Sequence, residues 1–273
     1  MVPVNDENHG MASNKNKQGC SGYCTCCMEI HALPSSAARQ KGRELIEILE
    51  EKKAITLFTD SSEDSRFSTA PLFGEQRGKM FGVLKCLDRH GDTSWLYAFS
   101  GQFNGLWFVE GWAPPLFDLQ IFQALHDPVE GQIKELGAKM KRFPADSDQH
   151  QLLSNQRRQL SQQLMIKLHD LYQLQNFAGE TATLHQAFTL PGGKPTGAGD
   201  CCAPKLLRLA AASDLLPLSL AEFYFGRSNR SGTKKHGLFY PPCIEKCQPL
   251  LGFLLCGIEQ RKQDFVNRPE HPA

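Results

Sequence analysis

Apolar residues recur at helical spacing in the first third of the chain. Leu45, Ile46 and Leu49 repeat among Arg, Lys and Glu residues, which places them on one face of a helix. Pro34 and two serines precede this pattern, and serine is favoured at helix N-termini. The pattern therefore predicts a helix over residues 36–52.

Runs of β-forming residues follow. Residues 80–87 (MFGVLKCL) and 94–99 (SWLYAF) are separated by a short polar stretch that contains Gly91. Two such runs around a glycine-containing turn predict a β-hairpin. Residues 216–226 (LPLSLAEFYFG) are almost continuously apolar, which is typical of a strand buried on both faces.

The middle of the chain is polar, with sparse apolar positions at helical spacing. Asp127 is followed by proline, a combination that favours a helix start, and the apolar positions continue until Pro144. Asp146 or Ser147 can cap a second helix that runs to about residue 177. The two helices predict an inserted antiparallel helical hairpin over residues 127–177. A structural arm is its simplest interpretation, and contact with a partner or RNA is the alternative.

Composition narrows the class of protein. The 273 residues carry a net charge of +1 and are 41% hydrophobic, enough apolar material for a core. The balanced charge argues against a broad nucleic-acid-binding face, so no DNA partner is expected. No apolar run approaches the ~20 residues of a membrane span, and residues 1–18 lack the apolar core of a secretory signal. We therefore expect a cytoplasmic protein with reduced thiols and no membrane partner.

These patterns also suggest how the chain is divided. We expect an N-terminal segment (1–34) that is disordered to about residue 18 and then cysteine-rich. It is followed by one α/β domain (35–126 with 178–257), the inserted helical hairpin (127–177) and a polar tail (258–273).

Ten cysteines in a reducing compartment favour metal binding over disulfides. Cys243 and Cys247 are four residues apart where a last helix is predicted to begin, and a helix N-terminus stabilises a thiolate. Cys201 begins another predicted helix. We predict that Cys201, His236, Cys243 and Cys247 hold one zinc ion, with Cys202 as an alternative fourth ligand. The competing interpretation is a set of scattered core cysteines and one surface histidine.

A second cysteine group lies near the N-terminus. Cys20, Cys24, Cys26 and Cys27 are followed by His31. Because no second cysteine pair completes this group at a usual spacing, free thiols are the default prediction and a second metal site is the alternative.

The order helix, hairpin, helix with a leading cysteine, strand, and helix with Pro-Cys-x3-Cys resembles the cytidine-deaminase-like fold. The resemblance implies a three-layer sheet with helices, in which Cys201, Cys243 and Cys247 hold zinc. The family's catalytic acid stands two residues after the first ligand, where this chain has Ala203. Glu222 is our candidate replacement as the proton shuttle. The alternative for Glu222 is a strand residue paired with a lysine or arginine.

A second resemblance covers roughly residues 78–257. Several segments occur in one order: GKMFGVLKCLD, YAFSG, APPLFD, GAGDCCAPKLL, LPLSLAEFYFG and HGLFYPPCIEKCQPLLG. They are similar to the long N-terminal accessory region of some bacterial RluA-type pseudouridine synthases, which implies an association with RNA modification. The string around Asp88 is the nearest to the synthase motif, but it lacks the preceding His-Arg and falls on a predicted turn. We therefore expect a stand-alone accessory region whose synthase catalytic domain is absent.

Three functional hypotheses follow. The first is a zinc-binding accessory module associated with RNA modification and without catalysis of its own, whose partner is RNA or an RNA-modifying enzyme. The second is a zinc-dependent nucleobase deaminase or hydrolase that uses Glu222, and the third is a pseudouridine synthase. Four basic residues are candidate RNA contacts, although a solvated loop is the simpler interpretation: Arg227, Arg230, Lys234 and Lys235.

Overall fold

The computed structural model describes residues 19–57 and 64–267, so the predicted disorder of residues 1–18 lies outside the described residues. Its centre is a four-stranded antiparallel sheet with the order β4-β3-β7-β8. The mixture of helices and strands agrees with the predicted α/β class. The four strands are β3 (Lys79–Leu87), β4 (Thr93–Phe99), β7 (Leu216–Phe225) and β8 (Phe239–Tyr240).

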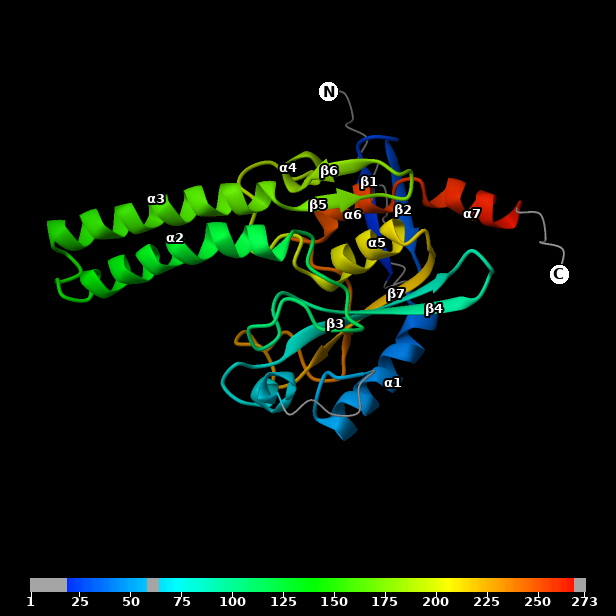
Figure 1. The fold of residues 1–273 in the computed structure, drawn as a ribbon, viewed down its shortest axis with the longest axis horizontal. Coiled ribbons are helices and arrows are strands. Elements are labelled where there is room, and N and C mark those ends of the chain that lie inside the picture. Colours follow the sequence, from blue (N-terminus) through cyan, green and yellow to red (C-terminus); the bar gives the residue numbers. More distant parts are fainter. Residues whose placement is uncertain (1–18, 58–63, 268–273) are drawn as a thin grey trace, which may run out of the picture.

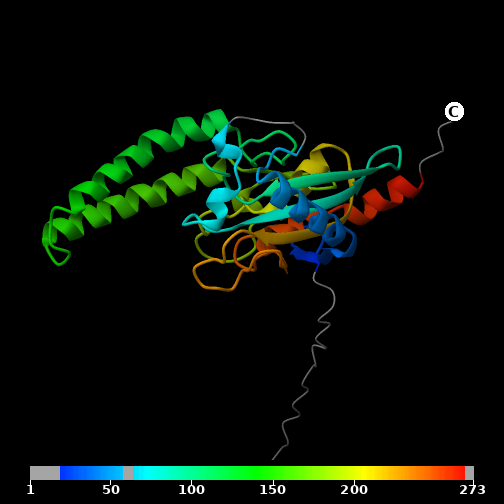
Figure 2. The same ribbon diagram turned by 90° about the horizontal axis from the view of Figure 1, so that it is seen from below.

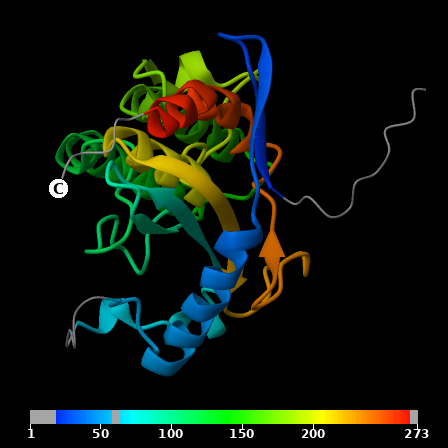
Figure 3. The same cartoon turned by 90° about the vertical axis from the view of Figure 1, so that its right-hand side faces the viewer.

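A helix lies against each face of this sheet (Figure 3). On one face, α1 (Ser36–Lys52) packs its leucines around Phe81, and its limits confirm the predicted helix. On the other face lies α5 (Cys202–Ala212). It approaches β3 closely at Gly82, where an added Cβ would lie 2.6 Å from the Cβ of Cys202. The sheet thus separates two hydrophobic clusters, and α5 is fixed against β3 at its first turn.

A small hairpin near the N-terminus packs on a C-terminal helix. Strands β1 (Cys20–Cys24) and β2 (Glu29–Leu33) pair with each other and lie along α6 (Gln248–Leu255) (Figure 1). The backbones meet at Gly252, where an added Cβ would lie 1.8 Å from the carbonyl oxygen of Tyr23. The cysteine-rich residues 20–33 are ordered, because alternate residues of β1 (Cys20, Gly22 and Cys24) are buried against α6.

Two long helices extend side by side away from the sheet (Figures 1 and 2). α3 (Asp148–Asp170) begins as predicted after Ser147, whose hydroxyl accepts the N–H of His150. α2 (Leu119–Met140) begins earlier than predicted. Asp118 caps it by accepting two backbone N–H groups, so Pro128 lies inside the helix and not at its start.

The residues after Gly257, predicted to be a tail, begin with a helix. In α7 (Ile258–Val266), Ile258 is fully buried and Arg261 pairs with Asp214. Among residues 19–57 and 64–267, no helix is both long enough and apolar enough to cross a membrane. The remaining short elements are η1 (Ser65–Phe67), η2 (Ala70–Phe73), β5 (Gln173–Gln175), β6 (Thr181–Thr183) and α4 (Leu184–Ala187).

Candidate metal centre

Three cysteine sulfurs meet where α5 and α6 begin. Cys201 is the N-cap residue of α5, Cys247 is the N-cap residue of α6, and Cys243 lies in the turn that precedes α6. Their Sγ atoms all lie within 4.8 Å of one another, and those of Cys243 and Cys247 are 3.2 Å apart. Three of the four predicted ligands are therefore brought together, and they could hold a metal ion.

The turn between Cys243 and Cys247 differs from the predicted helix start. The backbone N–H groups of Cys247 and Gln248 both donate to the carbonyl oxygen of Cys243, at 3.1 and 3.0 Å. These bonds close a turn over residues 243–247, and the regular helix begins only at Gln248. The three residues between the two cysteines are accommodated in this turn, which aims both sulfurs at Cys201.

His236 is not part of this cluster, so its predicted role as the fourth ligand is wrong in this structure. Its Nδ1 accepts the N–H of Gly226 at 3.0 Å, and its Nε2 lies 2.9 Å from Oε1 of Glu50. The alternative ligand Cys202 points elsewhere, because its Sγ donates to the carbonyl oxygen of Met80 at 3.4 Å. Within the part of the chain that the structure describes, no fourth metal-binding side chain joins the three sulfurs.

Hydrogen bonding among the thiols concentrates negative charge on Cys243. Its pKa is held well below the usual range, chiefly because the thiols of Cys201 and Cys247 donate to it. Backbone N–H groups of Lys246 and Cys247 assist. The same contacts raise the pKa values of Cys201 and Cys247. These contacts favour the thiolate form of Cys243, and the thiolate is the form that binds metals.

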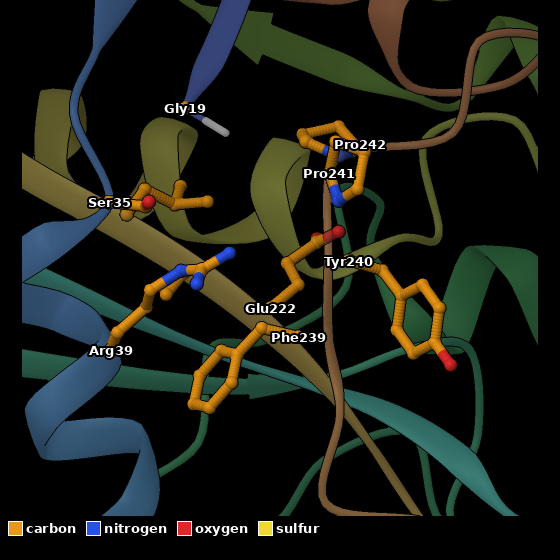
Figure 4. Close-up of a pocket in the computed structure, with 10 residues that line it drawn as sticks. Gly19, Ser35, Arg39, Glu222, Phe239, Tyr240, Pro241 and Pro242 are labelled. Atoms are coloured by element: carbon orange, nitrogen blue, oxygen red, sulfur yellow. The ribbon is translucent and has the colours of Figure 1, made fainter. Parts of the chain in front are cut away.

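The carboxylate of Glu222 lies at the same end of α5. Glu222 is on β7, is 4% exposed, and its Oε1 accepts the backbone N–H of Ala203 at 2.8 Å. Figure 4 shows the carboxylate pointing away from Phe239 and toward Pro241 and Pro242, which lead to the Cys243 turn. A carboxylate from β7 therefore reaches the first turn of α5, beside the start of the helix at Cys201.

Burial changes the acidity of Glu222. It raises the pKa of the carboxyl to about 7, and the negative charge of Cys243 acts in the same direction, while the Ala203 N–H opposes both. Among the described residues Glu222 forms no salt bridge, although the positive charge of Lys234, which lines the same cavity, acts to lower the pKa of the carboxyl. A group with this pKa exchanges a proton readily near neutral pH.

A cavity of about 340 Å³ adjoins the three cysteines and Glu222. On its wall, Asp200 accepts the hydroxyl of Tyr172 at 2.7 Å, and Lys246 donates to a loop carbonyl at 2.7 Å. Behind the wall, the buried Lys205 donates to the carbonyl oxygens of Phe99 and Gly101. Sequence reasoning missed Asp200 and Lys205, because no local pattern distinguishes them before the loop and helix are folded.

Of the four basic RNA-contact candidates, Lys234 lines the cavity. Its Nζ lies 4.4 Å from the ring centroid of Tyr240, and its backbone N–H donates a hydrogen bond to Oδ1 of Asn229. The other three, Arg227, Arg230 and Lys235, are exposed on the same loop.

Asp88, the residue nearest to a synthase motif, has a local structural role. It lies between β3 and β4, where its Oδ1 accepts the N–H groups of His90 and Asp92 at 2.8 and 3.0 Å. It does not line the cavity beside the cysteines. Its contacts are those of an ordinary turn aspartate.

Comparisons of the chain with protein-family models, with curated proteins and with solved structures found no match. The function must therefore be argued from the three cysteines, the buried carboxylate and the cavity that they share.

Proposed function

We propose that this protein is a zinc-dependent hydrolytic deaminase that acts on an amino-substituted nucleobase in the cavity beside Cys201, Cys243 and Cys247. One observation carries the proposal. The buried carboxylate of Glu222 accepts a hydrogen bond from the backbone N–H of Ala203 and lines the same cavity as the three cysteines. A sheet with a helix on each face, and a ligand at the start of α5, are also what a cytidine-deaminase-like fold would present.

The donor set supports zinc as the metal. Tetrahedral zinc with sulfur ligands at about 2.3 Å places the sulfurs about 3.8 Å apart. Three sulfurs within 4.8 Å of one another reach that arrangement with small side-chain shifts. Catalytic zinc sites use three protein ligands and leave one position for water or substrate, and the three cysteines that would hold the ion line the cavity. Zinc bound there supplies a Lewis acid that lowers the pKa of water to about 7.

Glu222 moves the proton. As water attacks the ring carbon that carries the amino group, a C–O bond forms, the electron pair of the ring C=N bond moves to the ring nitrogen, and the carboxylate takes the proton that the water releases. Glu222 then passes this proton to the amino nitrogen. The pair on the ring nitrogen restores the C=N bond as the C–N bond to the amino group breaks, ammonia leaves, and the hydroxyl product tautomerises to the carbonyl form. Because the Ala203 N–H fixes Oε1, the proton is exchanged at Oε2.

The cavity supports a nucleobase as the substrate. Its volume of about 340 Å³ is at the lower end of the range for small-molecule sites, which run from about 300 Å³ upward. Lys234 over Tyr240 provides a cation at the margin for a phosphate, and the exposed Arg227 and Arg230 extend this charge outward. These groups support RNA as the carrier of the base, with single-stranded RNA favoured because its bases can be unstacked.

Ammonia release tests this proposal. The purified protein is loaded with zinc and incubated with cytidine, adenosine and single-stranded RNA. We expect ammonia release to fall by about 10²-fold or more in Glu222→Gln, while bound zinc is unchanged. Glu50→Gln is the matched control, because Glu50 contacts His236 away from the cavity. Equal rates for Glu222→Gln and the wild type would contradict the assigned role.

A zinc-binding accessory module without catalysis is the second candidate. Ala203 in place of the family's acid favours it, as does the resemblance to the accessory region of RluA-type synthases. It predicts stoichiometric zinc, binding to RNA or an RNA-modifying enzyme, and no ammonia from any nucleoside or tRNA. The same assay therefore separates the two candidates. Pseudouridine synthesis ranks third, and would require tritium release from labelled uridine in RNA that Asp88→Ala abolishes.

A further inference from the structure

A second group of metal-binding side chains lies at the other end of α6. We propose that Cys24, Cys27, His31 and Cys256 hold a structural zinc ion that fastens the N-terminal hairpin to α6. The inference is independent of the proposed catalysis, because none of these four residues lines the cavity. Cys24 ends β1, His31 lies in β2, Cys27 lies in the turn between them, and Cys256 is the C-cap residue of α6.

The distances suit one tetrahedral ion. All four ligand atoms lie within 4.8 Å of one another. Sγ of Cys27 is 3.0 Å from Nε2 of His31 and 3.9 Å from Sγ of Cys256. Ligands around zinc are expected about 3.3–3.8 Å apart, given bonds of about 2.0–2.3 Å. Only small side-chain shifts would therefore be needed to surround an ion.

The loop around Cys24 has the form of a metal-binding turn. Cys24 and Cys27 have the Cys-x2-Cys spacing of many structural zinc sites. The backbone N–H groups of Cys26 and Cys27 donate to the sulfur of Cys24. Cys26 itself is exposed and outside the group, although it lies between two of the proposed ligands. The turn thus brings the sulfurs of Cys24 and Cys27 into the group and leaves that of Cys26 outside it.

The number of ligands, and the burial of three of them, favour a structural site. Cys24 is fully buried, His31 is 8% exposed and Cys256 is 7% exposed, whereas Cys27 is exposed and lies on the solvent side of the group. The group supplies four protein ligands, whereas the cluster at Cys201 supplies three. Four protein ligands are typical of structural zinc, and three are typical of catalytic zinc. A two-stranded hairpin is marginally stable alone, so an ion here would strengthen its attachment to α6.

Metal analysis of the full chain tests the proposal. We expect about two zinc ions per wild-type chain, and about one in Cys27→Ser or in Cys256→Ser. Cys26→Ser is the matched control and should keep both ions, because its sulfur is outside the group. Cys243→Ser should lose the other ion, and the double variant Cys27→Ser/Cys243→Ser should lose both. A wild-type chain that holds one ion, lost in Cys243→Ser and kept in Cys27→Ser, would overturn the second site.

A histidine series keeps the test decisive if the cysteine variants do not fold. His31→Ala should lose one zinc ion, whereas His31→Cys should retain it, because a fourth thiolate can replace the imidazole. Equal zinc contents in the two histidine variants would contradict the proposal. The outcome is also separable from the proposed catalysis. A chain with two zinc ions and no ammonia release would overturn the deaminase alone, and an active chain with one ion would overturn the structural site alone.

Discussion

Glu222 on β7 accepts a 2.8 Å hydrogen bond from the backbone N–H of Ala203 in the first turn of α5. The carboxylate comes from the strand and not from the helix, because β7 and α5 pack closely enough for one side chain to span them. In the proposed deaminase, the acid would thus be supplied by an element next to α5 and not by α5 itself.

Moving the carboxylate from β7 to α5 tests whether the positions of Glu222 and Ala203 are interchangeable. We expect Glu222→Ala to lower ammonia release by about 10²-fold or more. The double variant Ala203→Glu/Glu222→Ala should regain at least about tenfold, or about 1.4 kcal/mol of activation free energy. Steady-state rates at equal zinc content measure both. Ala203→Glu alone should be destabilised, because Ala203 is fully buried and a second carboxylate would face Glu222. Lack of any recovery would show that the two positions are not interchangeable.

The buried carboxyl also predicts how stability depends on pH in the metal-free protein. The folded-state pKa of Glu222 is raised from 4.5 to about 7, so the folded chain binds the proton more tightly than the unfolded chain. This stabilisation is fully present below about pH 4.5 and is lost as the pH rises through 7. As the pH rises through this window, the unfolding free energy of Glu222→Gln should increase by roughly 3 kcal/mol relative to that of the wild type, as measured by denaturant unfolding. A constant difference between the two curves would contradict the raised pKa.

Replacing glycine by alanine should have opposite effects at Gly252, where the hairpin contacts α6, and at Gly131, where the surroundings are open. Gly252→Ala places a methyl group 1.8 Å from the carbonyl oxygen of Tyr23, so the hairpin must move. We expect a loss of about 1–3 kcal/mol in unfolding free energy and a weakened zinc site at Cys24. Gly131→Ala in α2 has nothing within 4 Å of the new Cβ, and should gain about 0.5–1 kcal/mol. Thermal unfolding and zinc content measure both variants.

His236 provides a negative control for metal binding. Because both of its ring nitrogens contact other groups, His236→Ala should leave the zinc content of the chain unchanged. It should cost about 1 kcal/mol of stability through the lost acceptor for the Gly226 N–H. Loss of a zinc ion in His236→Ala, as expected for Cys243→Ser, would restore the original ligand assignment.

Local patterns in the sequence predicted local structure well. The helix over residues 36–52 and the hairpin of β3 and β4 depend on neighbouring residues, and both were found. The start of α2 was misplaced because Asp118 and Asp127 are both plausible caps. The proline after Asp127 favours a helix start there. The helix begins after Asp118 because its first turn is packed into the core by the buried Phe122.

The candidate sites were predictable only as far as their residues are close in sequence. The four-residue spacing of Cys243 and Cys247 indicates that they act as a pair. Cys201 could be added because it lies at the start of a predicted helix. Nothing in the sequence shows that His236 faces Glu50, 186 residues away, and not the three cysteines. Cys256 reaches Cys27 across 229 residues, so the fold must be known before the second group can be seen.

That separation in sequence has a consequence for biosynthesis. Cys27 in the turn of the hairpin is synthesised 229 residues before Cys256 at the end of α6. The hairpin can therefore dock on α6 only after that helix has left the ribosome. Long-range contacts of this kind also slow folding, because a large loop must close before they form. We therefore expect the hairpin to attach after α6 has formed, so that metal bound at the proposed site of Cys24 would report that this long-range contact is complete.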